Sequence, residues 1–96
     1  MIKHIVMFKF KPEADDDACR KVLADLRKLP DKIDVIREFA VGEDVLRSPR
    51  SWDAVLVSTF DDLETLQTYA RHDDHLEVAL RIQALVEKVA AVDYEF

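Results

Sequence analysis

Apolar and polar residues alternate along the first ten positions of the chain. A period of two predicts a β-strand over residues 2–10, and this strand would carry apolar side chains on both faces. One face holds Ile2, His4, Val6, Phe8 and Phe10. The opposite face includes Ile5 and Met7, so neither face of this strand is expected to be purely solvent-facing.

Three further segments have the β-branched and apolar character of strands, at residues 35–41, 52–60 and 91–96. Gly42 is the only glycine of the chain and is expected to end the strand before it. Residues 43–51 contain turn-forming serine and proline and predict a loop.

Helical spacing of apolar residues predicts two helical segments after the first strand and the third. The first follows Asp15, Asp16 and Asp17, whose carboxylates suit a helix N-terminus, and it is expected to stop at Pro30. Its predicted buried stripe is Ala18, Val22, Leu26 and Leu29, with Cys19 and Leu23 beside it. A short second helix is expected over residues 63–69, with Asp61 or Asp62 as its N-cap.

The pattern breaks near residues 71–74, and a third helix is expected to follow. Asp74 is the predicted N-cap, with Glu77 three residues later as in a capping box, and Asp73 is expected to be an exposed bend residue. The apolar stripe expected for this helix is Val78, Ile82, Leu85, Val86 and Val89.

The order βαββαβ predicts an α+β, ferredoxin-like fold: one domain over residues 1–96, with a four-stranded antiparallel sheet and helices on one face. The other face would hold Ile5, Met7, Val55 and Val57, or their neighbours if the facing is inverted. Leaving apolar area in water costs about 25 cal/mol per Å², so pairing with a second copy of the sheet is favoured. The chain is therefore expected to form a homodimer.

Composition narrows the range of partners. The chain carries 14 basic and 20 acidic residues, a net charge of −6, which disfavours nucleic acid and anionic membrane surfaces. Cys19 is the only cysteine, no segment has the long apolar run of a signal peptide or membrane span, and a cytoplasmic location is expected.

Four side chains form the candidate chemistry: His4 on the first strand, and Tyr69, His72 and His75 around the helix break. On an unbroken helix Tyr69 and His75 would lie about 120° apart around the axis. A break between them can turn both toward the gap between helix and sheet, where His4, Val6 and Phe8 would complete the lining. Imidazole beside a phenol in an apolar cleft forms a plausible acid/base pair.

The chain resembles the stress-responsive A/B barrel family over nearly its whole length. The resemblance rests on HIVMFKFKPE (residues 4–13), VSTFDDLETLQTYA (57–70), the spacing Tyr69-x-x-His72-x-x-His75, and the closing VDYEF. One departure is Asp73, where the family usually has proline. The resemblance implies a dimeric α+β barrel with a small apolar pocket in each subunit.

The resemblance also implies a role for the pair. Polyketide cyclases of the family use the tyrosine and the last histidine of this pattern for an intramolecular aldol condensation. Carried over, His75 is the base, Tyr69 orients or polarises a carbonyl, and His4 and His72 support the pocket wall. This chemistry requires no cofactor, and the partner would be a small hydrophobic metabolite.

Three other interpretations stay open at this point. The histidines and Tyr69 can be structural, in a dimer that only binds a ligand or has a stress-associated role. The fold alone is also compatible with a cofactor-free monooxygenase or isomerase. A metal site at His72, Asp73, Asp74 and His75 is disfavoured, because their spacing matches no specific metal motif.

Overall fold

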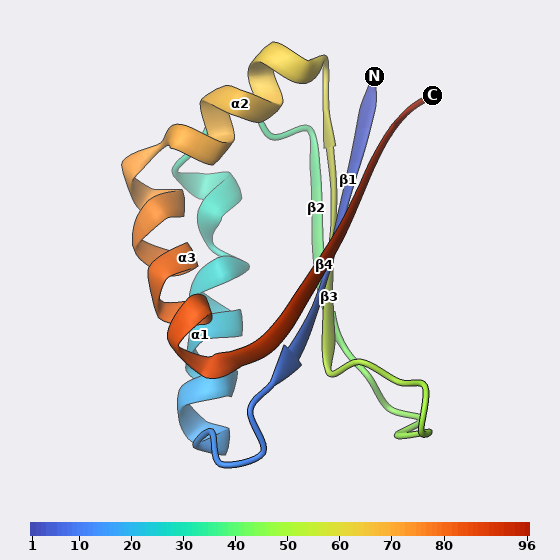
Figure 1. The fold of residues 1–96 in the computed structure, drawn as a ribbon. Helices are drawn as coiled ribbons and strands as arrows, with labels where there is room; N and C mark the ends of the chain where they lie inside the picture. The colour runs from blue at the N-terminus through green and yellow to red at the C-terminus, as the bar shows by residue number, and fades with distance from the viewer.

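The computed structural model describes residues 1–96 and has the expected ferredoxin-like α+β order. Its elements are β1 (Ile2–Phe10), α1 (Asp16–Leu26), a 3-10 turn (Leu29–Asp31), β2 (Glu38–Glu43), β3 (Ala54–Phe60), α2 (Leu63–Arg71), α3 (Asp73–Leu85) and β4 (Val86–Glu95). The strands form one antiparallel sheet in the order β2-β3-β1-β4. The helices lie on one face of this sheet, and no element covers the other (Figure 1).

The core lies between the helices and the helix-facing side of β1 and β3. Phe8, Leu56 and Phe60 from the sheet pack with Val22 and Leu26 of α1, and each is at most 5% exposed. His4, Val6 and Phe8 share this side, as the alternation along β1 predicted. Of the two facings that the sequence left open, the structure therefore has the one that places Ile5 and Met7 on the side away from the helices.

The opposite face of the sheet is open to solvent and has apolar side chains at its centre, with the Lys3–Glu38 ion pair toward one end. Ile5 of β1 lies between Val57 of β3 and Val92 of β4 in the strand register. Val92 is 62% exposed and Met7 38% exposed, although both belong to the sheet. Apolar side chains on both faces of β1 thus coexist with a layer of helices on only one of them.

The helix N-termini are held largely as the sequence predicted. The Asp15 carboxylate accepts the Ala18 backbone N–H at 2.9 Å and caps α1. Asp62 caps α2 through a capping box with Thr65. The first helix ends at Leu26, before the expected stop at Pro30, because the chain tightens there into the 3-10 turn that contains this proline.

The second strand lies further along the chain than residues 35–41. The segment that contains Val35 and Ile36 packs against the core as a connection, and strand pairing begins at Glu38 opposite Thr59. Gly42 does not end the strand. It pairs with Val55, where even a side-chain β-carbon would make ordinary contact at 3.8 Å.

The third strand starts at Ala54 rather than at residue 52, and the side chain of the preceding Asp53 bonds to the end of β1 and to the loop. Its carboxylate accepts the backbone N–H of Phe10 at 2.7 Å and bonds to the Arg47 guanidinium at 2.9 Å. These bonds fasten the loop before β3 to the end of β1.

The third helix and the last strand differ most from expectation. The helix ends at Leu85, and Val86 and Val89 belong to β4, where they pair with β1. Its N-cap is His72 rather than Asp74: the Asp74 backbone N–H donates to His72 Nδ1 at 3.1 Å. Asp73 is exposed, as expected, but it is the first residue of the helix.

These caps predict different costs for two aspartate substitutions. Asp62→Ala removes the side-chain cap, which is one half of the capping box, so we expect a loss of about 1 kcal/mol in the free energy of unfolding. Asp74→Ala removes only a first-turn carboxylate and is expected to cost about 0.5 kcal/mol or less. Urea unfolding of both variants measures the difference. Equal losses would contradict the assignment of the caps.

Candidate active site

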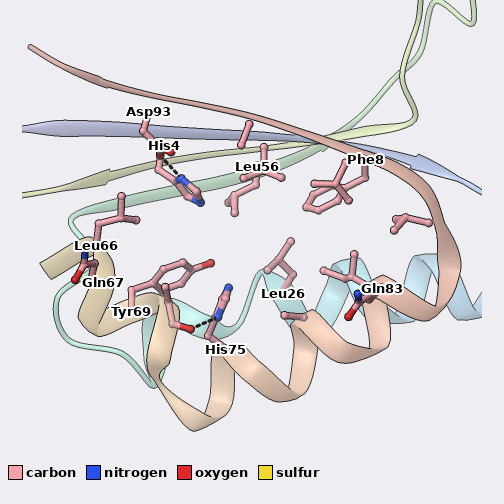
Figure 2. Close-up of a pocket in the computed structure, with 17 residues that line it drawn as sticks. His4, Phe8, Leu26, Leu56, Leu66, Gln67, Tyr69, His75, Gln83 and Asp93 are labelled. Carbon is pink, nitrogen blue, oxygen red and sulfur yellow. Dashed lines mark hydrogen bonds and ion pairs between the residues drawn. The ribbon is translucent and has the colours of Figure 1, made fainter. Parts of the chain in front are cut away.

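A cavity of about 590 Å³ lies between the helices and the sheet, and 12 of its 17 lining residues are hydrophobic. Side chains reach it from β1, β3, β4, α1, α2 and α3 (Figure 2). Tyr69, His75, His4 and Asp93 lie toward the end near the junction of α2 and α3, whereas Gln83 lies toward the other end (Figure 2). Phe8, Leu26 and Ile82 make up part of the apolar remainder. A ligand with one polar end and an apolar body fits this distribution.

Tyr69 is the most buried polar side chain of the cavity. It is 1% exposed and packs between the rings of Phe60 and His75, with ring centroids at 5.0 and 4.5 Å. Its hydroxyl is buried and has no hydrogen-bond partner in the protein. Burial raises the pKa of Tyr69 well above its ordinary value, so the hydroxyl stays protonated and can donate.

His75 is held in one tautomer by the backbone. Its Nδ1 lies 2.9 Å from the carbonyl oxygen of Ala70, and because a carbonyl can only accept, Nδ1 carries the proton. The lone pair of the neutral ring is then on Nε2. Burial lowers the pKa of His75 below its ordinary value, against a smaller opposing effect of the Ala70 hydrogen bond. The ring is therefore neutral near pH 7 and can accept a proton.

His4 approaches the cavity from the sheet, opposite His75. Its Nδ1 is hydrogen-bonded to a carboxylate oxygen of Asp93, which lies beside it on β4. This bond leaves Nε2 of His4 on the cavity side, and the Tyr69 hydroxyl points into the space between the two imidazoles (Figure 2). His4, from the first strand, thus meets Tyr69 and His75, from the junction of α2 and α3, around one small volume.

The structure brings together five of the six residues that the sequence analysis singled out. Tyr69, His75, His4, Val6 and Phe8 line the cavity. His72 does not line it, contrary to expectation, because its ring folds back to cap α3.

Sequence reasoning missed Asp93 and the two residues that shape the apolar end from the last strand, Val86 and Val89. Asp93 is a neighbour of His4 only through the pairing of β1 with β4. The sequence does show an acidic residue near the end of the expected last strand. Only the register between β1 and β4, however, reveals that this residue lies beside His4.

Other candidate groups lie elsewhere in the structure. No three His, Cys, Asp or Glu side chains are arranged to hold a metal ion together. Cys19 is buried, and burial together with the nearby Asp16 carboxylate raises the pKa of its thiol. No helix has the length and apolar character to cross a bilayer.

Comparison with known proteins finds relatives that match nearly the whole chain. Stress-response A/B barrel domain-containing protein HS1 of Arabidopsis thaliana is 24% identical over 96 residues, covering 98% of this chain and 88% of the relative. Olivetolic acid cyclase of Cannabis sativa is 24% identical over 95 residues, covering 97% of this chain and 94% of the cyclase.

Solved structures also match this chain over nearly its whole length. A dimeric protein of unknown function with a ferredoxin-like fold, from Bacteroides fragilis, superimposes with a TM-score of 0.84 at 34% identity, covering 99% of this chain and 95% of the other. The family model described as "Stress responsive A/B Barrel Domain" matches residues 2–96. Since the match spans nearly the whole chain, this protein belongs to the stress-responsive A/B barrel domain family.

Proposed function

We propose that this protein is a cofactor-free acid/base enzyme that removes a proton from the carbon next to a ketone. In this proposal a linear β-keto metabolite with an apolar end binds in the cavity and closes into a ring. The observation that carries the proposal is the Tyr69 hydroxyl, buried without a partner beside the free Nε2 of His75.

The Tyr69 hydroxyl determines what the ligand must offer. A buried hydroxyl without a hydrogen bond costs about 1–3 kcal/mol, and a ligand that supplies an acceptor recovers this energy. Because the pKa of Tyr69 is raised, the hydroxyl is a donor, and the matching group is a carbonyl oxygen. Hydrogen bonding to that oxygen would strengthen as it gains negative charge on enolisation.

His75 is the proposed base. Its Nε2 lone pair takes the proton from the carbon next to the carbonyl, while the Ala70 carbonyl stabilises the imidazolium that forms through the Nδ1–H. The resulting enolate carbon attacks a second carbonyl of the same molecule, forming a carbon–carbon bond. The oxygen of the attacked carbonyl then receives the proton from His75. Atoms and charges balance with no redox partner.

The remaining lining supports a substrate with an apolar body. Leu26, Ile82 and Val86 surround the end of the cavity away from the histidines. Burying this part of a ligand gains about 25 cal/mol per Å² and would orient the keto groups toward Tyr69. A sequence relative named as a cyclase is consistent with ring closure. His4, oriented by Asp93, would contact the keto end from the sheet.

We also propose that the working unit is a homodimer joined through the open face of the sheet. The support is the apolar row across Val57, Ile5 and Val92, together with the dimeric relative that is 34% identical. A second sheet placed on this row would remove its apolar side chains from water. The helices and the cavity lie on the other side, so both sites would stay reachable.

Substitution of Tyr69 distinguishes an effect on stability from an effect on catalysis. Tyr69→Phe deletes the unpartnered hydroxyl while keeping the ring, so the thermal midpoint of the free protein should stay the same or rise. Conversion of linear poly-β-keto acids with alkyl ends of different lengths, followed by mass spectrometry and ultraviolet absorbance, should fall by about 100-fold or more.

A Tyr69→Phe variant that still cyclises a substrate at the wild-type rate would remove Tyr69 from the mechanism. A wild-type protein that binds these compounds without converting them would indicate a ligand-binding dimer instead. The matched control is Tyr94→Phe, because Tyr94 is an exposed tyrosine on β4 outside the cavity lining.

A pH dependence follows from the lowered pKa of His75. Below its ordinary value of 6.5 the unfolded chain takes up a proton that the folded ring resists. The free energy of unfolding should therefore decrease as pH falls from 6.5 to the lowered folded pKa, whereas above 6.5 this residue contributes no slope. His75→Gln should lose this part of the pH dependence. Urea unfolding on both sides of pH 6.5 tests it, and parallel curves would contradict it.

The dimer proposal predicts the effect of a charge on the open face. Val57→Asp would place a carboxylate in the proposed interface, so sedimentation should change from a two-subunit particle to a monomer. Leu80→Asp is the control, because Leu80 is 69% exposed on α3, away from the sheet. A wild-type chain that sediments as a stable monomer, or a Val57→Asp variant that dimerises normally, would refute this interface.

A further inference from the structure

The junction between α2 and α3 replaces one backbone hydrogen bond of a continuous helix with two bonds to side chains. In a continuous helix the Ala70 carbonyl would accept the N–H four residues later, which belongs to Asp74. Here the Asp74 N–H donates instead to His72 Nδ1 at 3.1 Å. The Ala70 carbonyl oxygen receives the Nδ1–H of His75 at 2.9 Å. The capping of α3 by His72 and the orientation of His75 therefore both follow from the loss of the bond between the Asp74 N–H and the Ala70 carbonyl.

No proline enforces this junction, since residues 71–74 are Arg, His, Asp and Asp. Backbone sterics alone therefore allow the helix to continue through it. Continuation would turn the Ala70 carbonyl along the helix axis toward the Asp74 N–H. The His72 ring, half-buried at the junction, supplies the acceptor that holds this N–H away.

The loss of this backbone bond determines which nitrogen of His75 is available for chemistry. With Nδ1–H bonded to Ala70, the lone pair on Nε2 faces the cavity that contains the Tyr69 hydroxyl. If the carbonyl were taken by Asp74, the ring would lose the partner that selects this tautomer and fixes its plane.

We propose that His72 is a positioning residue: by capping α3 it leaves the Ala70 carbonyl free to hold His75 with its lone pair directed into the cavity. This inference deepens the proposed function and rests on it for the role of His75 as base. His72 itself contacts no substrate, because it lies outside the cavity lining.

The test compares His72→Ala, which has no acceptor, with His72→Asn, whose side-chain oxygen can accept the same N–H. Nitrogen-15 NMR of the His75 ring, in the protein without ligand, distinguishes the nitrogen that carries the proton from the one with the lone pair. We expect the wild type and His72→Asn to show Nδ1–H. His72→Ala should shift the ring toward Nε2–H and lower kcat by about tenfold with little change in KM.

Asp73→Ala is the matched control. Asp73 is exposed beside His72 in the first turn of α3, and its side chain makes no hydrogen bond in the structure. This variant loses a favourable helix-dipole charge, so it should lower the stability slightly. The His75 ring signals should nevertheless stay at their wild-type positions, which separates a change in tautomer from a general loss of stability.

The NMR result tests the positioning role of His72, and the turnover of His75→Ala tests the role of His75 as the base. An unchanged His75 tautomer in a folded His72→Ala variant would overturn the positioning role, even if His75→Ala abolishes turnover. A shifted tautomer that His72→Asn restores would support it. Should His72→Ala fail to fold, His72→Leu, which has no acceptor and fills more of the space of the imidazole, takes its place. Turnover that survives His75→Ala would refute the proposed base and leave the NMR result to stand by itself.

Discussion

The antiparallel pairing of β1 with both β3 and β4 is the constraint on which the rest of the structure depends. Because β1 is internal, its side chains on one face lie under the helices, and those on the other face lie in the middle of the open sheet. Phe8 belongs to the core, His4 to the cavity, and Ile5 to the open face. One strand with a period of two therefore contributes to stability, to the candidate site and to the proposed interface.

The cavity places polar groups where a small protein can least easily tolerate them. Domains of this size have thin cores and net stabilities of about 5–15 kcal/mol, so an unpartnered buried hydroxyl is a sizeable fraction of the total. Tyr69 keeps this hydroxyl while its ring contacts Phe60, Phe39 and both cavity histidines. The aromatic contacts and the burial of the ring offset the cost. A group retained at such a cost inside a cavity is more consistent with a ligand-directed role than with packing alone.

The sequence predicted the fold well because the fold depends on local periodicity. The alternation from Ile2 to Phe10 identified the strand and its two sets of side chains, and the acidic run at Asp15 identified a helix start. The errors arose where one pattern fits two structures. Val86 and Val89 continue the helical spacing of α3, yet both belong to β4. Residues three apart share a face of this strand because its register with β1 shifts between Lys9 and Phe10, which no local pattern predicts. Histidine is not among the preferred N-cap residues, so Asp74 was the better candidate by residue type alone.

The candidate site was predictable only in part, for a related reason. Tyr69 and His75 are close in sequence, and a helix break was enough to bring them together. Asp93 is 89 residues from its partner His4, and no local pattern indicates which residue of β4 lies beside it. That neighbour relation is fixed by the register of two strands at opposite ends of the chain, where the N-terminal amine and the Phe96 carbonyl are also hydrogen-bonded.

The position of β4 has a consequence for how the site is assembled. β4 is an edge strand, bonded to the sheet only through β1, and it carries Asp93 and Val89 into the cavity wall. Tyr69 and His75 depend instead on the junction of α2 with α3, on the opposite wall. The two walls share no element, so each can be disturbed without directly breaking the other.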